Sequence, residues 1–474
     1  MEEKEIVIIG GGPGGYVAAI RSAQLGCRVT LIEKEELGGT CLNWGCIPTK
    51  ALLRGVEILE NLRHAAEFGI QMGEVKIDFL KLMARKDRAV KTIVSGVTNL
   101  LKTWGVEVIK GKASLLSPKE IEVFDQQGEK RKILAKKLIL APGSIPAELP
   151  FPGRNLSKVI DSQGALQLKR IPHSIVIIGA GPIGLEFGTI FTALGSKVTI
   201  IEMRPQILPQ EDEEIASALE RILKRNSMQI NLNCLVKEIS ESQEGAKEVR
   251  AILNNREEKL FTGEYVLIAG GRQPNLEELG VEKAGIKVGP KGIEVNGKME
   301  TNIPGIYAVG DVTGQILLAH FAMAQGVAAA ENAVGREVTL KPRVVPRCIY
   351  TLPEVAAVGL TEEEAKKAGY DLKIGHYPFA ANGKATAMGE RNGFVKVIAE
   401  KKYGEVLGIH ILGPQATDLI GEAILAMRLE ATAQDIAHTI HPHPTLSEAL
   451  MEAALDVNGE ARHLPPPKKT KFNF

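Results

Sequence analysis

Two stretches of this 474-residue chain repeat one another, and their shared pattern restricts the fold more than any other feature. Residues 6–34 read IVIIGGGPGGYVAAIRSAQLGCRVTLIEK and residues 175–203 read IVIIGAGPIGLEFGTIFTALGSKVTIIEM, with 14 of 29 positions identical and no gap. Each stretch begins with a four-residue apolar run, which is typical of a strand buried in a parallel sheet. A glycine-rich turn, a short helical segment and a second apolar run follow in both. We therefore expect two β-α-β units and an α/β fold.

Each unit carries the pattern G-x-G-x-x-G, with an acidic residue at the end of its second apolar run. The glycine pattern alone is a weak indicator, but the strand-turn-helix context and the acid complete what a dinucleotide site requires. The glycines allow a tight turn and let the backbone approach a pyrophosphate at the helix N-terminus. The alternative is a pair of tight turns that bind no ligand. The expected cofactor contacts are Gly10, Gly12, Gly15 and Glu33 in the first unit, and Gly179, Gly181, Gly184 and Glu202 in the second.

The acids also indicate which nucleotide would bind. Glu33 and Glu202 would accept hydrogen bonds from a ribose diol. A carboxylate at Glu202 would repel a 2′-phosphate, which favours NAD over NADP, although Arg204 lies two residues further on. Two sites in one chain imply two different dinucleotides, or one unit that has lost its ligand.

A cysteine pair follows the first acid in the string GGTCLNWGCIPTK, where Cys41 and Cys46 are five residues apart. Five residues of helix rise about 7.5 Å, whereas a disulfide joins Cα atoms about 4.4–6.8 Å apart. Closure therefore needs a distorted turn, for which Gly45 is permissive and Pro48 disfavours regular helix. Two unrelated buried thiols or half of a zinc site are alternatives, but no further ligands stand nearby to complete a zinc site. A redox disulfide beside the cofactor explains the glycine, the proline and the spacing together.

Composition excludes several classes of protein. The 58 basic and 57 acidic residues leave a net charge of +1, which argues against a dedicated nucleic-acid binder. Five cysteines are few and odd in number, unlike a secreted disulfide framework. The start MEEKE has no basic region before an apolar segment, and the longest uncharged run, residues 312–330, contains glycine, glutamine and histidine. We expect a cytoplasmic protein that binds no nucleic acid, membrane or metal, with residues 312–330 forming a buried helix.

Residues 439–448 read TIHPHPTLSE and hold two of the nine histidines. No third and fourth ligands stand nearby to complete a metal site. Imidazole titrates near neutrality and is suited to moving a proton from a thiol. Because thiol–disulfide exchange requires a thiolate, one of these histidines is a candidate base.

With these motifs the chain resembles the class I pyridine nucleotide–disulfide oxidoreductases. The cysteine string carries the resemblance, together with LAPGS at 140–144, GGRQPN at 270–275 and TNIPGIYAVGD at 301–311. The chain departs from the family at Trp44, where a smaller apolar residue is usual, and at Pro142, where threonine is usual. The resemblance covers nearly the whole chain. It implies two Rossmann-like dinucleotide-binding domains, for FAD and NAD, and an α+β C-terminal dimerisation domain. The corresponding segments would be 1–147 (FAD-binding), 148–276 (NAD-binding), 277–345 (a return to the FAD-binding region) and 346–474 (interface).

The resemblance also implies roles for individual residues. Cys41 and Cys46 would be the redox pair, and His443, oriented by Glu448, would be the base that reaches the pair of the partner subunit in a homodimer. Lys50 would pair with Glu186 beside the flavin; a buried carboxylate in the otherwise uncharged segment 175–196 is costly unless it is paired. The remaining implied contacts are Asp311, Ala113, Ala319 and Lys50 for FAD, and Val236 and Gly271 for NAD.

Within the family, the chain is most similar to the members that oxidise protein-bound dihydrolipoamide. Its last cysteine is Cys348, so the C-terminal cysteine pair typical of mercuric reductases is absent, and its second acid is Glu202 where NADP-dependent members have basic residues nearby. The strings LAHFA at 318–322 and YTLPEVAAVG at 350–359 also match. The implied reaction oxidises dihydrolipoamide on lipoylated carrier domains of a 2-oxoacid dehydrogenase or glycine cleavage complex and reduces NAD⁺. The alternatives are an NAD(P)H-dependent reductase of another small disulfide, and a subunit retained mainly for docking.

Overall fold

The two repeated stretches form matching β-α-β units in the computed structural model, which describes residues 2–125, 127–254, 256–277 and 279–466. The first unit consists of β1 (Glu2–Ile9), α1 (Pro13–Gln24) and β2 (Val29–Glu33), and the second of β9 (Ser174–Ile178), α6 (Pro182–Ala193) and β10 (Lys197–Ile201). In each unit the two strands are parallel neighbours. The expectation of two units of the same kind is confirmed.

The apolar runs are continuous because both faces of these strands are covered. In β1, Ile6 and Ile8 pack against the side that carries α1, while Val7 and Ile9 pack into a separate cluster on the opposite face. Successive side chains of a strand point to opposite faces, so a strand buried on both sides cannot alternate with polar residues.

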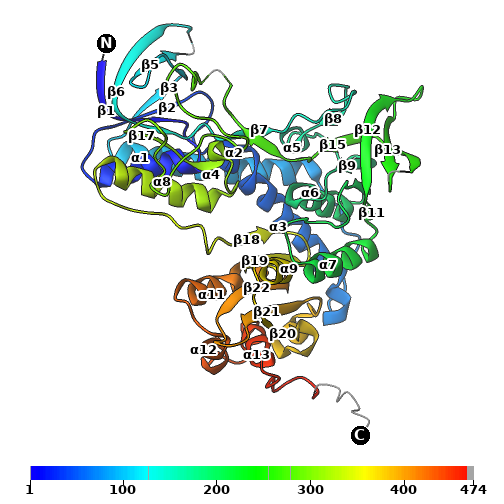
Figure 1. The fold of residues 1–474 in the computed structure, drawn as a ribbon. Helices are drawn as coiled ribbons and strands as arrows, with labels where there is room; N and C mark the ends of the chain where they lie inside the picture. Colours follow the sequence, from blue (N-terminus) through cyan, green and yellow to red (C-terminus); the bar gives the residue numbers. More distant parts are fainter. Residues whose placement is uncertain (1, 126, 255, 278, 467–474) are drawn as a thin grey trace.

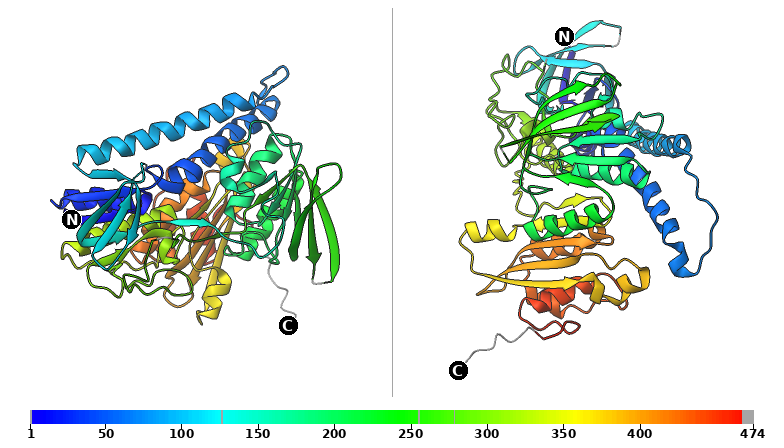
Figure 2. Two further views of the ribbon diagram at one scale, coloured as in Figure 1. Left: turned by 90° about the horizontal axis from the view of Figure 1, so that it is seen from above. Right: turned by 90° about the vertical axis from the view of Figure 1, so that its right-hand side faces the viewer.

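The first sheet has the strand order β3–β2–β1–β6–β5–β4, with β17 beside β6. Its further strands are β3 (Glu107–Lys110), β4 (Lys112–Leu115), β5 (Glu120–Phe124), β6 (Lys130–Leu140) and β17 (Ile306–Ala308). Helix α8 (Ala319–Ala333) packs along α1, and a Cβ at Gly326 would collide with the carbonyl oxygen of Gly14. The long helices α3 (Cys46–Arg63) and α4 (Phe79–Thr103) form a pair that extends from this sheet past α6 (Figure 2).

The second sheet has the order β11–β10–β9–β15–β8, and the antiparallel sheet β12–β13–β14 lies beside it (Figure 1). These strands are β8 (Val159–Ile160), β11 (Gln229–Asn231), β12 (Cys234–Glu241), β13 (Lys247–Leu253), β14 (Glu257–Gly263) and β15 (Tyr265–Ile268), with helices α5 (Ser162–Ala165) and α7 (Glu213–Arg225). The chain leaves the first sheet through β7 (Ser144–Pro146) and returns through β16 (Arg272–Pro274). These two crossings pair with each other antiparallel.

The C-terminal part forms an antiparallel sheet of order β18–β19–β22–β21–β20, drawn in yellow to red in Figure 1. Its strands are β18 (Arg347–Ile349), β19 (Glu354–Gly359), β20 (Leu372–Pro378), β21 (Phe394–Glu400) and β22 (Val406–Gly413), with helices α9 (Glu362–Lys367), α10 (Gly383–Met388), α11 (Ala416–Arg428), α12 (Ala433–His438) and α13 (Glu448–Asp456). Two Rossmann-like units and an α+β C-terminal domain are therefore confirmed as the fold class.

The uncharged run 312–330 divides between the 3-10 helix η2 (Gly310–Thr313), a loop and α8. Many residues of α8 are buried, as expected for a helix inside a large protein. None of the helices that the structure describes is both long and apolar enough to cross a membrane.

Candidate active site

A cavity of about 1560 Å³ lies where the first sheet, the second unit and the C-terminal domain meet. It exceeds the roughly 300–1,000 Å³ usual for small-ligand sites. Its lining includes these predicted site residues: Gly10, Gly12, Glu33, Cys41, Cys46, Lys50, Ala113, Glu186, Gly271, Asp311 and Ala319. Among the described residues, the predicted sites outside this lining are Gly15, Gly179, Gly181, Gly184, Glu202, Val236, His443 and Glu448. The cavity thus gathers residues from distant parts of the sequence, from Ile9 to Ile424.

The glycines of each turn have two different roles. Gly10 has a φ of +102°, and a Cβ there would collide with the carbonyl oxygen of Ala141. A Cβ at Gly15 would collide with the carbonyl oxygen of Gly10, so both positions need glycine for the turn itself. Gly12 is different, since its nearest neighbour would be 3.9 Å from a Cβ. A Cβ at Gly181, the middle glycine of the second turn, would meet no atom of the described residues within 4 Å, apart from its chain neighbours. These open positions fit a turn whose backbone approaches a phosphate.

The two strand-end acids hold the turns in place. Glu33 accepts hydrogen bonds from the backbone N–H of Gly11 (2.6 Å) and Glu35 (2.7 Å). Glu202 accepts the equivalent bonds from Ala180 and Arg204, both at 2.8 Å. Each carboxylate oxygen has further lone pairs for a ribose hydroxyl. The sequence indicated the ligand contact but not this attachment to the protein backbone.

The cysteine pair lies at a break between two helices. Helix α2 (Gly39–Trp44) ends before Gly45, whose φ of −138° and ψ of −107° are not helical, and α3 begins at Cys46. The Cys41 and Cys46 sulfur atoms lie 2.7 Å apart. The expectation that Pro48 interrupts the helix is wrong, because α3 runs through it. Pro48 is in the first turn of α3, where a missing N–H breaks no hydrogen bond of the helix.

The two thiols differ in acidity. The hydrogen bond from Cys41 and the nearby Lys50 lower the pKa of Cys46 to about 7, although burial opposes this. The same hydrogen bond, together with burial, raises the pKa of Cys41 far above that of an ordinary thiol. When the pair is reduced, Cys46 is therefore the thiolate and Cys41 keeps its proton.

Lys50 and Glu186 form the ion pair that the resemblance implies. The Lys50 ammonium lies 2.8 Å from both carboxylate oxygens of Glu186, whose side chain is 6% exposed. Tyr350, which directly follows β18, completes this arrangement. Its backbone N–H donates to Glu186 (3.1 Å), and its ring centre lies 4.4 Å from the Lys50 ammonium. The motif YTLPEVAAVG contains Tyr350 but does not indicate this role, because only the fold shows that β18 ends at the ion pair.

Asp311 belongs to a second group of hydrogen-bonded polar residues on the cavity wall, separate from the Lys50–Glu186 ion pair. The Ser144 hydroxyl donates to the Asp311 carboxylate (2.5 Å) and accepts from the Arg272 guanidinium (2.7 Å). Ser144 and Arg272 lie on the two paired crossings β7 and β16. Ser144 belongs to the motif LAPGS and Arg272 to the motif GGRQPN, but their contact depends on this pairing across 128 residues.

The remaining predicted residues would contact the cofactors through their backbone atoms. Ala113 lies in β4, Ala319 is the first residue of α8, and Gly271 has a φ of +116° between β15 and β16. Val236 lies in β12, at a register shift opposite β13.

His443 and Glu448 are paired, but the fold does not bring them to the cysteines of the same chain. The His443 Nδ1 atom lies 2.9 Å from the Glu448 carboxylate, which also accepts the Thr445 backbone N–H. The His443 side chain is 78% exposed. Its loop between α12 and α13 lies at the end of the molecule opposite α2 (Figure 1). Its neighbour His441 contacts Glu422 (2.8 Å) instead.

Comparison with known proteins identifies the family. Residues 4–326 match the family described as pyridine nucleotide-disulphide oxidoreductase, and residues 345–454 match the dimerisation domain of that family. The chain belongs to the pyridine nucleotide-disulphide oxidoreductases. Relatives of this oxidoreductase include dihydrolipoyl dehydrogenases of Bacillus subtilis and Thermus scotoductus. The first is 43% identical over 461 residues (97% of this chain, 99% of the relative), and the second is 44% identical over 467 residues (98% and 99%).

Solved structures give the same fold. The Cu(II) complex of the HOCl-induced flavoprotein disulfide reductase RclA from Escherichia coli aligns with a TM-score of 0.86 and 30% identity, over 96% of this chain and 99% of that one. The predicted family and the enzyme class, an oxidoreductase, are therefore confirmed.

Proposed function

We propose that this oxidoreductase is a dihydrolipoyl dehydrogenase, which oxidises protein-bound dihydrolipoamide to lipoamide and reduces NAD⁺. The observation that carries this proposal is the Cys41–Cys46 pair, with its opposite pKa shifts, in a cavity lined by parts of both β-α-β units. The near full-length similarity to dihydrolipoyl dehydrogenases supports it.

The first turn is suited to FAD and the second to NAD. The open positions at Gly12 and Gly181 leave room for a pyrophosphate, and Glu33 and Glu202 have lone pairs for ribose hydroxyls. The flavin contacts would be Lys50, Ala113, Asp311 and Ala319, and further NAD contacts would be Val236 and Gly271. The flavin would carry an electron pair between the cysteine pair and the nicotinamide.

The residues of the chain handle the thiol chemistry. His443, held by Glu448, takes a proton from one thiol of dihydrolipoamide. The resulting thiolate attacks the Cys41 sulfur of the disulfide, and Cys46 leaves as a thiolate. The second substrate thiol then displaces Cys41, which closes lipoamide and leaves Cys41 protonated. The raised pKa of Cys41 and the lowered pKa of Cys46 match this distribution of one proton over two sulfurs.

A homodimer accounts for the distance between His443 and the cysteines. We assign His443 to the cysteine pair of the partner subunit, because it is exposed and outside its own cavity. The match of residues 345–454 to a dimerisation domain supports this arrangement. The proposed boundaries remain 1–147, 148–276, 277–345 and 346–474, and the proposed partners are lipoylated carrier domains of a 2-oxoacid dehydrogenase or glycine cleavage complex.

Three variants test the assignment in steady-state and half-reaction assays. Cys46→Ser should abolish dihydrolipoamide oxidation, whereas Cys27→Ser, which changes a half-buried thiol outside the cavity lining, should not. His443→Gln should slow reduction of the enzyme by dihydrolipoamide and spare its reduction by NADH. Full turnover by Cys46→Ser would refute the proposal. Activity with NADH and another small disulfide, but none with dihydrolipoamide, would establish the reductase alternative.

A further inference from the structure

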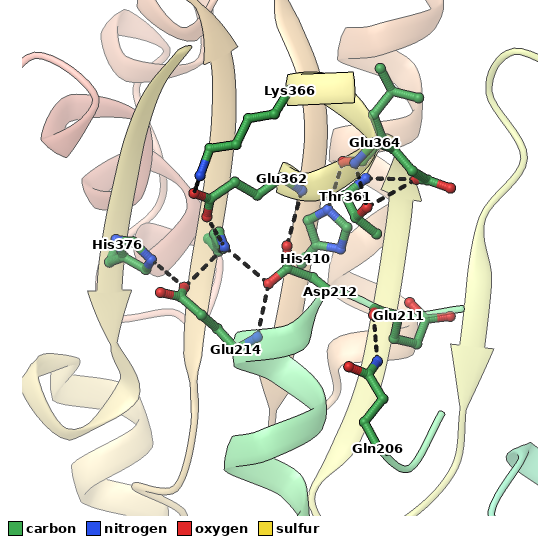
Figure 3. Close-up of polar contacts among 12 residues, drawn as sticks. Gln206, Glu211, Asp212, Glu214, Thr361, Glu362, Glu364, Lys366, His376 and His410 are labelled. Carbon is green, nitrogen blue, oxygen red and sulfur yellow. Dashed lines mark hydrogen bonds and ion pairs between the residues drawn. The ribbon is translucent and has the colours of Figure 1, made fainter. Parts of the chain in front are cut away.

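An ion cluster with a buried centre joins helix α7, which follows the second β-α-β unit, to the C-terminal domain (Figure 3). We call Lys396, Asp212, Glu214 and Glu362 the junction cluster. The Lys396 side chain, on β21, is 1% exposed, and its ammonium lies 2.9 Å from Asp212, 3.0 Å from Glu214 and 2.7 Å from Glu362. Asp212 and Glu214 are at the start of α7, and Glu362 is at the start of α9. One ammonium therefore connects two helix ends from separate parts of the fold.

Asp212 is the centre of this junction. Its Oδ1 accepts the backbone N–H of Glu214 (3.2 Å), which caps α7. Its Oδ2 accepts the backbone N–H of Glu362 (3.1 Å), the first residue of α9. A single carboxylate thus satisfies unpaired N–H groups at the beginnings of two helices.

Lys396 supplies the buried positive charge that faces the three carboxylates of the junction cluster. His410 is fully buried next to Asp212, and burial lowers its pKa to about 4, so the ring is neutral at physiological pH. His376 contacts the outer carboxylate, Glu214, at 2.8 Å, but not Asp212. Removing the ammonium would leave the buried Asp212 carboxylate without its nearest cation, and an unpaired buried charge is costly.

The segment between the second strand-end acid, Glu202, and Asp212 links the junction to the second glycine turn. In this segment, residues 203–211, the backbone N–H of Leu208 donates to the carbonyl of Ala180 (2.9 Å), within the glycine turn. The side chain of Gln206 donates to the carbonyl of Glu211 (3.1 Å), and Pro209, Gln210 and Glu211 line the cavity. The segment therefore contacts the second turn at one point and the junction at its end.

A second ion pair holds the same segment against the C-terminal domain. The Arg347 guanidinium, on β18, lies 2.7 Å from the Glu211 carboxylate, whose side chain is 5% exposed. Three residues further along the chain, Tyr350 contacts the Lys50–Glu186 pair. The C-terminal domain thus contacts both the segment 203–211 and the ion pair beside the cysteines.

We propose that the junction cluster positions residues 203–211, so that the C-terminal domain sets the affinity of the second turn for NAD. Lys396 and Asp212 are positioning residues, because they act through the segment that contacts the turn. This inference rests on the proposed binding of NAD at the second turn.

The test compares Lys396→Met with Lys366→Met in the full-length flavoprotein. Methionine preserves an apolar side chain of similar length and removes the charge. Lys366 also contacts Glu362, but its side chain is 63% exposed and outside the buried cluster, so it is a matched control. Lys396→Met should raise the dissociation constant for NADH and the KM for NAD⁺ about tenfold, within the range usual for coupled sites. Reduction of the enzyme by dihydrolipoamide should be unchanged.

Hydrogen exchange provides a readout that does not depend on turnover. Lys396→Met should increase exchange in residues 203–211, while Lys366→Met should not. If Lys396→Met does not fold, Glu362→Gln gives a milder change at a carboxylate that is 24% exposed, with a smaller effect in the same direction.

The outcomes separate the two proposals. A wild-type enzyme that fails to bind NADH would refute the assignment of the second turn. A wild-type enzyme that binds NADH, with variants that bind it equally well, would overturn the role of the junction cluster. An equal loss of NADH binding and of reduction by dihydrolipoamide would also overturn it, because it would indicate general damage to the fold.

Discussion

Removing the Cys41 thiol should raise the pKa of Cys46. The structure lowers that pKa from 9.0 to about 7, and the hydrogen bond from Cys41 is the largest cause. A shift of about two units corresponds to about 3 kcal/mol in favour of the thiolate. At pH 7, about half of Cys46 would be thiolate, against about 1% of a thiol with a pKa of 9. Cys41→Ala should therefore move the half-point of Cys46 ionisation upward by one unit or more.

Two further variants test the order of the causes. Lys50→Met should raise the pKa by less than Cys41→Ala, since the lysine is a smaller contribution. Glu186→Gln should lower it, because the Glu186 carboxylate disfavours a second negative charge nearby. General loosening of the site would not explain a pKa of Cys46 that rises in Lys50→Met and falls in Glu186→Gln.

The assay is the rate of alkylation of Cys46 in the reduced enzyme as a function of pH. Mass spectrometry of the peptide that contains Cys46 separates it from the other cysteines. An unchanged half-point in Cys41→Ala would refute the reasoning. Without the hydrogen bond from Cys41, the burial of Cys46 should raise its pKa. A half-point near 9 in the wild-type enzyme would refute it as well.

Four other predictions concern the second glycine turn, its strand-end acid and the C-terminal domain. Gly184→Ala should destabilise the protein by about 1–3 kcal/mol in thermal unfolding, because its Cβ would collide with the backbone of its own turn. Gly181→Ala has open space and should spare stability while weakening NADH binding in titrations. Glu202→Gln should improve kcat/KM for NADP⁺ relative to NAD⁺ by roughly tenfold, and an unchanged ratio would contradict the charge argument. Glu422→Gln should lower Tm at pH 6 but not at pH 9. The hydrogen bond to Glu422 raises the pKa of His441, so this pair stabilises the fold below a pH of about 6.5 and the effect disappears as pH rises through the folded pKa. Equal destabilisation at both pH values would contradict this assignment.

Local patterns in the sequence were sufficient to predict the two repeated units. The glycine turns, the doubly buried strands and the strand-end acids act within about 30 residues of one another, so their geometry follows from the local chain. The cysteine pair could be predicted for the same reason. Pro48 shows the limit of this approach, since its effect depends on whether it lies in the first turn of a helix or in its interior.

Contacts between distant strands could not be predicted from the sequence. Lys396 and Asp212 are 184 residues apart, and either alone would be interpreted as an exposed charge. Their contact depends on the register of β21 and on the docking of the C-terminal domain against α7. The same holds for Tyr350, whose role becomes visible only when β18 ends beside Glu186.

The return of the chain to its first sheet has a consequence for synthesis. Strand β17 pairs with β6 at residues 138–140, but it emerges from the ribosome about 170 residues later. At about 5–20 residues per second, that edge of β6 stays open for roughly 10–30 s. An unpaired edge strand can pair with other chains. The segment between β6 and β17, which contains the second β-α-β unit, therefore leaves this edge of the nascent chain unpaired until residue 308 has been added.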